Sequence, residues 1–464
     1  MPFVWANVIR IDRLSDWKEE GRLEIIRRTR GTPLCVKGNI IDNPSTFPFS
    51  TQFIELQWAR IRKLDLRIYA DYYSRSLWME LFARPAPYLE SFKAVVKTNW
   101  YPVIFPAGRY IFDGAAPSLR TLHTTNIAFK LTAPWKSQLR RLRLDSLQHT
   151  ADDMMEAIRS MPLLEHLDLQ VDAIPPIPFP DEMSIKLPNL TFLRLSHNFR
   201  ANLIFAHAID PSESCRLIWI DQGGGMFGDI QQDSLQAIFN VLSRYSRTYS
   251  LAGRTSFSTL HGNSEAFRFR GSLAHSHRLH LDVRPFYIDI VVEFPKGSLP
   301  LCFFSTPSSG LVFASVKNLD FRLESGPSLL GRWTGVSTFL KTFPSVVTLN
   351  ISSGVLDDLI FSSPPNEGLI FPLLQELSVH FKLSPDRKKV SSLHSFLEFR
   401  KDLGHPIAEL CLAGKQLSDW SLLEGIHGLK VVWEKGGTKY EYTCGNGRPE
   451  RLNFWVGVFV QVPG

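Results

Sequence analysis

The glycine-rich segment GGGMFG, residues 223–228, formally satisfies the G-x-G-x-x-G pattern of a dinucleotide-binding turn. In that motif a strand–turn–helix unit brings backbone amides to a pyrophosphate. Here the expected helix starts about five residues too late, and no acidic residue ends a strand about 20 residues further on. We therefore interpret the segment as a loop and predict no bound cofactor.

Two other groups of residues could do chemistry. His275 and His277 form a weak metal-ligand pattern, but the sequence HSH is more typical of a polar loop. Asp152 and Asp153 could form an acid–base pair, yet they stand at the start of an expected helix, where the macrodipole favours negative charge. The P-loop, H-E-x-x-H and G-x-S-x-G motifs do not occur in the sequence. We therefore predict that the chain is not an enzyme and that it has no catalytic or metal site.

A third group could bind a partner rather than react with one. It combines arginine, aromatic and carboxylate side chains at alternating positions of expected strands: Arg141, Arg143, His166, Asp168, Phe192, Arg194, Trp219 and Asp221. Aromatic and arginine side chains dominate the hot spots of protein interfaces. The alternative is that most of these are ordinary solvated strand residues. The strand register would then slip near Cys215 and place Trp219 in the core.

The segment LRRLRLDSL, residues 139–147, indicates how such side chains are positioned. Its leucines alternate with arginines, so one face of a strand would be apolar and the other polar. Apolar residues at positions 1, 4 and 6 recur in segments that begin at Ile61, Leu89, Leu119, Leu139, Leu164, Leu190, Cys215, Val316, Val346, Leu374 and Ile407. This pattern is the leucine-rich-repeat template, whose period is about 20–29 residues.

Helical patterns lie between these expected strands. Thr150 is a suitable N-cap for a helix over residues 150–161, and apolar stripes at helical spacing cover 235–242, 336–343 and 393–397. A strand plus a helix per repeat predicts a right-handed α/β leucine-rich-repeat solenoid, curved and irregular, with strands on its concave face. The leucines expected in its core are Leu142, Leu144, Leu167, Leu169, Leu193 and Leu195.

The same register places one residue of each of four consecutive repeats in a row on the concave face: Arg143, Asp168, Arg194 and Trp219. We predict that this row contacts a protein partner, with Trp219 as the apolar anchor and the arginines as orienting donors. Both charge signs occur along the row, so a partner of mixed charge is expected.

The repeats also suggest a domain organisation. We expect an N-terminal segment and capping unit over residues 1–58 and the solenoid over 59–432, with an irregular or inserted section at 223–310. Residues 433–464 would form a C-terminal cap or tail.

Composition narrows the class of protein. The 464 residues are 44% hydrophobic and 21% charged, which are globular values. No stretch is long and apolar enough to span a membrane, and the first residues lack a secretory signal. The 5 cysteines form no CxxC pair, which favours a reducing compartment, cytoplasmic or nuclear. The net charge of +7 is spread along the chain, whereas nucleic-acid binding usually shows as a concentrated basic face.

The N-terminal sequence MPFVWANVIRI, followed by LEIIRRTRGTPLCV, resembles the stretch just after the F-box in F-box/leucine-rich-repeat-like proteins of mushroom-forming fungi. In that family a P-x-LW-x-x-I segment leads to a helix, then to R-S-G-x-x-P-L and the first strand. The matching residues here are Pro2, Trp5, Ile9, Arg28, Gly31, Pro33 and Leu34. The segments IRSMPLLEHLDL and FPLLQELSV resemble the family's order of helix, proline and repeat strand.

The resemblance implies a substrate-recruiting subunit of a cullin-type ubiquitin ligase. It implies binding of a Skp-type adaptor only if F-box helices are supplied upstream, because no residue of this sequence matches the adaptor-binding helices. One alternative is a truncated or degenerate structural paralogue without a ligase link. Another is an anionic-ligand binder that uses Arg67, Arg141, Arg143 and Arg194. Interleaved Asp65, Asp145, Asp168 and Asp221 would repel phosphates, so we expect a protein partner rather than nucleic acid.

Overall fold

The structure is a computed structural model that forms two compact units, Met1–Gly223 and Gly224–Gly464. It describes residues 2–7, 9–41, 47–69, 75–97, 103–104, 110–145, 149–171, 184–197, 199–212, 215–221, 240–241, 244–245, 256–262, 266–273, 287–293, 316–323, 340–353, 356, 369–381, 385, 387–414, 418–435 and 437–454. The predicted glycine loop 223–228, the HSH histidines and the helical stripe at 235–242 fall wholly or largely outside these ranges, as does most of the stripe at 336–343.

The first unit contains a long sheet whose strands all run parallel. In spatial order they are β1 (Ile9–Arg10), β2 (Leu34–Ile41), β3 (Ile61–Tyr69), β4 (Ser91–Lys97), β6 (Thr121–Thr125), β8 (Arg141–Asp145), β9 (His166–Val171), β11 (Phe192–His197) and β13 (Arg216–Asp221). Two short parallel pairs lie apart from it: β5 (Val103–Ile104) with β7 (Ile127–Ala128), and β10 (Ile185–Leu187) with β12 (Ile209–Pro211). The chain is therefore an α/β protein, as predicted.

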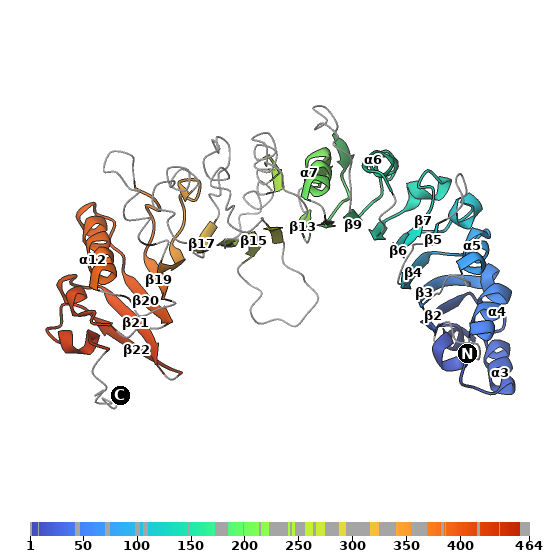
Figure 1. Cartoon of the computed structure of the whole chain (residues 1–464), viewed down its shortest axis with the longest axis horizontal. Coiled ribbons are helices and arrows are strands. Elements are labelled where there is room, and N and C mark those ends of the chain that lie inside the picture. Colours follow the sequence, from blue (N-terminus) through green and yellow to red (C-terminus); the bar gives the residue numbers. More distant parts are fainter. Residues whose placement is uncertain are drawn as a thin grey trace. The chain divides into compact units, whose positions relative to one another are not determined.

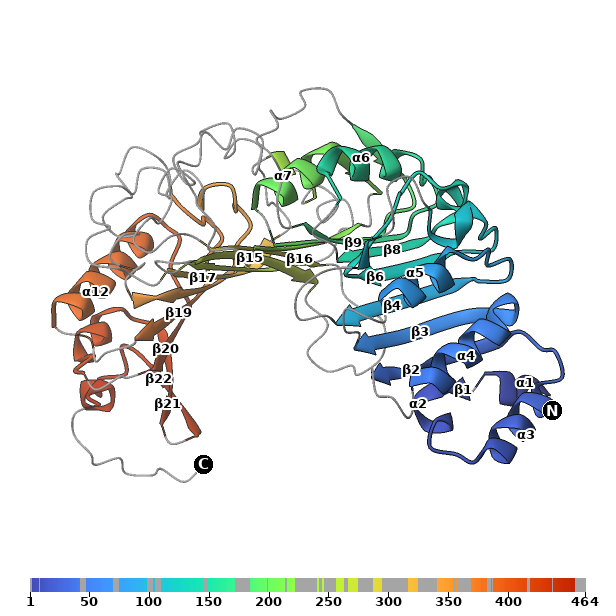
Figure 2. The same ribbon diagram turned by 45° about the vertical axis from the view of Figure 1, so that its right-hand side comes forward.

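The helices of this unit connect successive strands, except for the first, which precedes β1. They are α1 (Pro2–Ala6), α2 (Ile11–Leu14), α3 (Glu19–Thr29), α4 (Phe47–Gln57), α5 (Arg75–Ala83), α6 (Ala151–Arg159) and α7 (Phe199–Ala208), with 3-10 turns η1 (Trp58–Arg60), η2 (Ile111–Gly114) and η3 (Pro134–Gln138). Figures 1 and 2 show α4, α5, α6 and α7 on the same side of the sheet. In the part of the unit that the structure describes, the other side of the sheet carries no helix.

The core of the first unit lies between the sheet and these helices. All six leucines expected in the core, from Leu142 to Leu195, are at most 2% exposed, so that prediction is confirmed. They align across β8, β9 and β11, where Leu142 lies opposite Leu167 and Leu144 opposite Leu169. The predicted N-cap of α6 is also confirmed, because the Thr150 hydroxyl accepts a hydrogen bond from the Asp153 amide at 3.1 Å.

The repeats differ in what fills the connection between strands. Besides the short strands β5 and β7, the described residues contain only η2 between β4 and β6 and only η3 between β6 and β8, in place of the expected α-helices. The repeat that begins at Leu119 is also the shortest of the series, which leaves too few residues for a full α-helix. Buried aromatic rings fill the space instead: Phe112 packs edge-on against both Phe92 and Trp135.

The second unit contains a mixed sheet of six consecutive strands. These are β17 (Val316–Leu323), β18 (Thr348–Ser352), β19 (Glu376–Phe381), β20 (Glu409–Gly414), β21 (Lys430–Lys435) and β22 (Thr438–Thr443), of which β22 alone is antiparallel to its neighbour. At the other edge β14 (Ser256–Gly262) pairs in parallel with β17, and β15 (Ala266–Leu273) and β16 (Tyr287–Glu293) continue the sheet in antiparallel pairs. The predicted stripe at 393–397 lies in helix α12 (Arg387–Asp402), and the 3-10 turns η4 (Ser421–Gly425) and η5 (Pro449–Leu452) follow.

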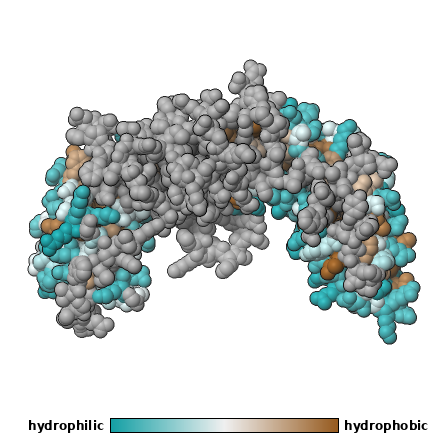
Figure 3. All heavy atoms as spheres, viewed as in Figure 1, coloured by the Kyte–Doolittle hydropathy of each residue, from teal (hydrophilic) through white to brown (hydrophobic). Residues whose placement is uncertain are grey.

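The surface of the described residues is largely hydrophilic in the view of Figure 3, with hydrophobic residues in scattered patches. None of the described helices is long and apolar enough to cross a membrane.

Candidate functional site

The candidate site is the side of the parallel sheet in the first unit that carries no helix among the described residues, which we call the open face. It consists of side chains of β2–β13 that alternate with those facing the helices, and strand register places them in three rows. Most are partly exposed, but Ser196 and Ile218 are buried. Row 1 is Cys35, Lys63, Ser91, Thr121, Arg141, His166, Phe192 and Arg216. Row 2 is Lys37, Asp65, Lys93, His123, Arg143, Asp168, Arg194 and Ile218, and row 3 is Asn39, Arg67, Val95, Thr125, Asp145, Gln170, Ser196 and Ile220.

Row 2 contains a charge cluster of two arginines that share one carboxylate. The Nε atoms of Arg143 and Arg194 lie 3.4 Å and 3.9 Å from the two carboxylate oxygens of Asp168. The Asp168 side chain is only 17% exposed. Burial raises its pKa, although both guanidinium groups act in the opposite direction. The cluster thus holds one anion and two cations in a partly desolvated site.

A second ion pair lies further along row 2. Lys93 contacts the Asp65 carboxylate at 3.2 Å, and both side chains are partly exposed. His123 stands between Lys93 and Arg143 in the register. Burial, followed by the charges of Arg143 and Lys93, lowers the pKa of His123 to about 4. This histidine is therefore neutral at physiological pH and adds no charge to the row.

Row 1 carries an aromatic cluster beside the charged one. The rings of His166 and Phe192 are 5.8 Å apart, and the Arg216 guanidinium lies 5.6 Å from the Phe192 ring on the next strand. Arg141 precedes His166 in the row and is exposed. Planar cationic and aromatic groups thus adjoin across neighbouring strands, an arrangement that suits non-covalent contact with a partner.

Six of the predicted partner-binding residues lie together on β8, β9 and β11: Arg141, Arg143, His166, Asp168, Phe192 and Arg194. The seventh, Trp219, does not lie on this face. Its side chain is fully buried and its partner in the register is Leu195, a core residue. The prediction of Trp219 as a surface anchor is therefore wrong. The backbone of Asp221 pairs with His197 at the end of β13.

The physical reason is the phase of strand β13. Its apolar run Leu217, Ile218, Trp219 and Ile220 fits the repeat template in either of two phases, because both sets of alternating residues are apolar. Register with β11 selects the phase in which Leu217 and Trp219 are buried. Arg216 and Ile218 consequently join rows 1 and 2. The sequence template missed both, and reading β13 one residue out of phase would have found them.

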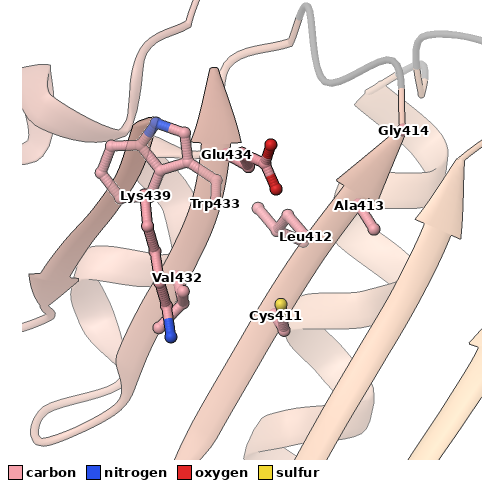
Figure 4. A pocket seen from close by; sticks show the side chains of 8 residues that line it. All are labelled: Cys411, Leu412, Ala413, Gly414, Val432, Trp433, Glu434 and Lys439. Atoms are coloured by element: carbon pink, nitrogen blue, oxygen red, sulfur yellow. The ribbon is translucent and has the colours of Figure 1, made fainter. Parts of the chain in front are cut away.

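The second unit has a pocket of about 380 Å³ over strands β20 and β21. Figure 4 shows that Cys411, Val432 and Lys439 line it together with Trp433 and Glu434. Burial raises the pKa of the Cys411 thiol, the opposite of what a reactive thiolate requires. The described residues that line the pocket include no histidine that could act as a base for this thiol.

The described residues contain no group of three or more histidine, cysteine or acidic side chains that could hold a metal ion. The sequence matches no known protein-family model and no curated protein. A functional assignment therefore depends on the open face itself.

Proposed function

We propose that this chain is a non-enzymatic leucine-rich-repeat solenoid that binds a protein on its open face. The eleven segments with the repeat pattern all contain strands, and parallel pairs with in-register leucines recur within each unit. Each repeat has too little apolar surface to form a core alone, so stacking of repeats explains why this pattern recurs.

One observation carries the binding role. Rows 1 and 2 bring three arginines, the Phe192 ring and the largely buried Asp168 carboxylate onto three adjacent strands of a face without a described helix. Arginine and aromatic residues in a partly desolvated cluster are typical of interface hot spots. A merely solvated strand surface would have little reason to keep Asp168 this deeply buried between two guanidinium groups.

Affinity capture from the native cell extract, followed by binding measurements with the captured protein, tests this proposal. We expect Arg143→Glu and Phe192→Ala each to weaken binding by roughly tenfold or more, as interface hot spots do. Arg159→Glu is the matched control, because this exposed arginine lies on α6. Equal binding by all the folded variants would place the interface elsewhere.

The family resemblance extends the proposal to recruitment of substrates for a cullin-type ubiquitin ligase. The two segments that carry the resemblance contact each other, because the Arg28 guanidinium lies 4.9 Å from the Trp5 ring. Ile9 then pairs with Val36 at the start of the sheet. This supports a single N-terminal element built from both segments.

Co-purification with a Skp-type adaptor, and ubiquitination of the captured partner in a reconstituted ligase, test this extension. A structural paralogue without a ligase link would show neither. That outcome would leave the binding role of the open face intact.

A further inference from the structure

The open face is strongly basic. Its three rows contain eight cationic side chains: Lys37, Lys63, Arg67, Lys93, Arg141, Arg143, Arg194 and Arg216. They contain three carboxylates, Asp65, Asp145 and Asp168. The formal excess is five positive charges on a surface of eight strands, within a chain whose total is +7. Asp65 and Asp168 already contact cations of the same face.

The charge cluster of row 2 has two cations but only one anion, Asp168. Asp168 is shared between two guanidinium groups at distances longer than a well-formed charge-assisted hydrogen bond. The Nε of Arg194 is buried and has no hydrogen-bond acceptor among the described residues. The Arg194 side chain is nevertheless 35% exposed, so a carboxylate from outside the chain could contact its exposed part and balance the second arginine.

The neighbouring row indicates what should accompany that carboxylate. The partly exposed rings of Phe192 and His166 lie directly beside the cluster. An apolar or aromatic side chain next to an acidic one would cover the rings while the carboxylate contacts Arg194. The rows span about 34 Å, seven steps of ~4.8 Å, which corresponds to an extended segment of about ten residues.

A nucleic acid fits this surface less well. Single-stranded nucleic acids are held by a basic groove together with several aromatic platforms on which successive bases stack. Apart from histidines, the three rows contain one aromatic side chain, Phe192. Trp219 cannot serve as a second platform, since it is buried in the core. Asp65, Asp145 and Asp168 also interrupt the cations, which would repel a continuous phosphate backbone.

We propose that the open face binds an acidic, extended protein segment that places carboxylates at Arg143 and Arg194 and an apolar side chain at Phe192. This inference rests on the proposed function, since it names the partner class for the same face. Binding to such a segment weakens as salt concentration rises, because the contacts are partly exposed ion pairs.

Selection of random peptides of about 12 residues displayed on phage, against the full chain, tests the proposal. We expect enriched peptides with several acidic residues and at least one aromatic or aliphatic residue. Their synthetic forms should bind Arg141→Glu roughly tenfold more weakly. Arg141 is exposed and outside the Asp168 cluster, so this variant leaves that cluster intact. Arg194→Glu tests the cluster directly, thermal unfolding verifies that both variants fold, and Arg159→Glu should bind as the parent does.

The other outcomes separate the two proposals. Neutral or basic peptides that still require Arg141 and Arg194 would overturn the acidic partner but keep the open face as the binding surface. No enrichment, or peptides that bind every variant equally, would contradict both. An oligouridine RNA that binds more tightly than the peptides and displaces them would assign the face to nucleic acid and overturn the inference.

Discussion

The open face of the first unit carries eight cationic side chains and three carboxylates in three rows, whereas two of the corresponding rows of β17–β21 in the second unit are mostly neutral or acidic. Those rows read Asn318, Thr348, Glu376, Glu409 and Lys430, and Asp320, Asn350, Ser378, Cys411 and Val432. The residues on the inward face are similar in the two units, since aligned, buried leucines recur in both. Packing therefore fixes one face of each strand and leaves the chemistry of the other free to differ.

The two units also differ in how their sheets end. The first begins with the two-residue strand β1, which offers little unpaired edge. The second ends in the hairpin β21–β22, where the Trp433 ring stacks on Tyr440 and packs against Phe454. Lys430 and Glu441 form an ion pair at 2.8 Å across the same hairpin. Aromatic packing and charge thus cover the last repeat strand.

Core truncation should give the largest effect and should be similar in both units. Leu167 in β9 and Leu377 in β19 are both at most 1% exposed. We expect Leu167→Ala and Leu377→Ala each to reduce the free energy of unfolding by about 2–5 kcal/mol. Urea unfolding followed by circular dichroism measures this. A loss below ~0.5 kcal/mol in either variant would show that the aligned leucines do not support the two units equally.

Much of this arrangement could be predicted from the sequence. Alternation of leucine with polar residues located strands β3, β4, β6, β8, β9, β11, β13, β17, β18, β19 and β20, because the pleat of a strand has a period of two. Thr150 marked the start of α6 because a hydroxyl before an acidic first turn caps a helix. Such signals are local, so a single sequence is enough to find them.

Features that depend on distant residues could not be predicted. The phase of β13 is set by its neighbour β11, since alternation is uninformative where Leu217 through Ile220 are all apolar. The replacement of helices by η2 and η3 depends on the aromatic rings that fill the space. The charge excess of the open face appears only when register adds Lys37 of β2 and Arg216 of β13 to the cations of the repeat template. The expectation of a mixed-charge partner depended on the single row Arg143, Asp168, Arg194 and Trp219.

A buried arginine distinguishes the second unit. Arg400, near the end of α12, is 1% exposed and donates hydrogen bonds to the carbonyl oxygens of Ile370 and Phe371 at 3.0 and 2.9 Å. Arg400→Met should cost about 2–4 kcal/mol in the free energy of unfolding, because two buried acceptors lose their donor. Lys401→Met, the exposed neighbour, should cost less than ~0.5 kcal/mol. Equal effects in urea unfolding would mean that the desolvation of Arg400 offsets its hydrogen bonds.

Acid should weaken the first unit through its buried histidines. Burial lowers the pKa of His149 to about 4, so the folded state resists a proton that the unfolded chain accepts near pH 6.5. Stability from this group is present above pH 6.5 and is lost as pH falls towards 4. Between pH 7 and 5 the loss should be about 1–2 kcal/mol.

His149→Gln should remove that part of the pH dependence, and exposed His405 in the second unit provides the matched control as His405→Gln. Urea unfolding at the two pH values measures both. An unchanged pH dependence in His149→Gln would show that this histidine is not responsible for acid weakening.

The smallest effect should come from neutralising one carboxylate in each unit. Asp65 on the open face contacts Lys93 at 3.2 Å, and Glu409 in the second unit contacts Lys430 at 3.6 Å. Each pair is partly exposed, so Asp65→Asn and Glu409→Gln should change the free energy of unfolding by less than ~1 kcal/mol.

The same two variants should differ in peptide binding. Asp65→Asn releases Lys93 and raises the excess of positive charge beside the proposed acidic segment. We expect the selected acidic peptides to bind this variant roughly threefold more tightly, about 0.6 kcal/mol, and to bind Glu409→Gln as they bind the parent. Fluorescence anisotropy at low salt measures both affinities. An equal gain in both variants would indicate attraction to the net charge of the whole chain, and the contrast between the two units would then have no role in partner choice.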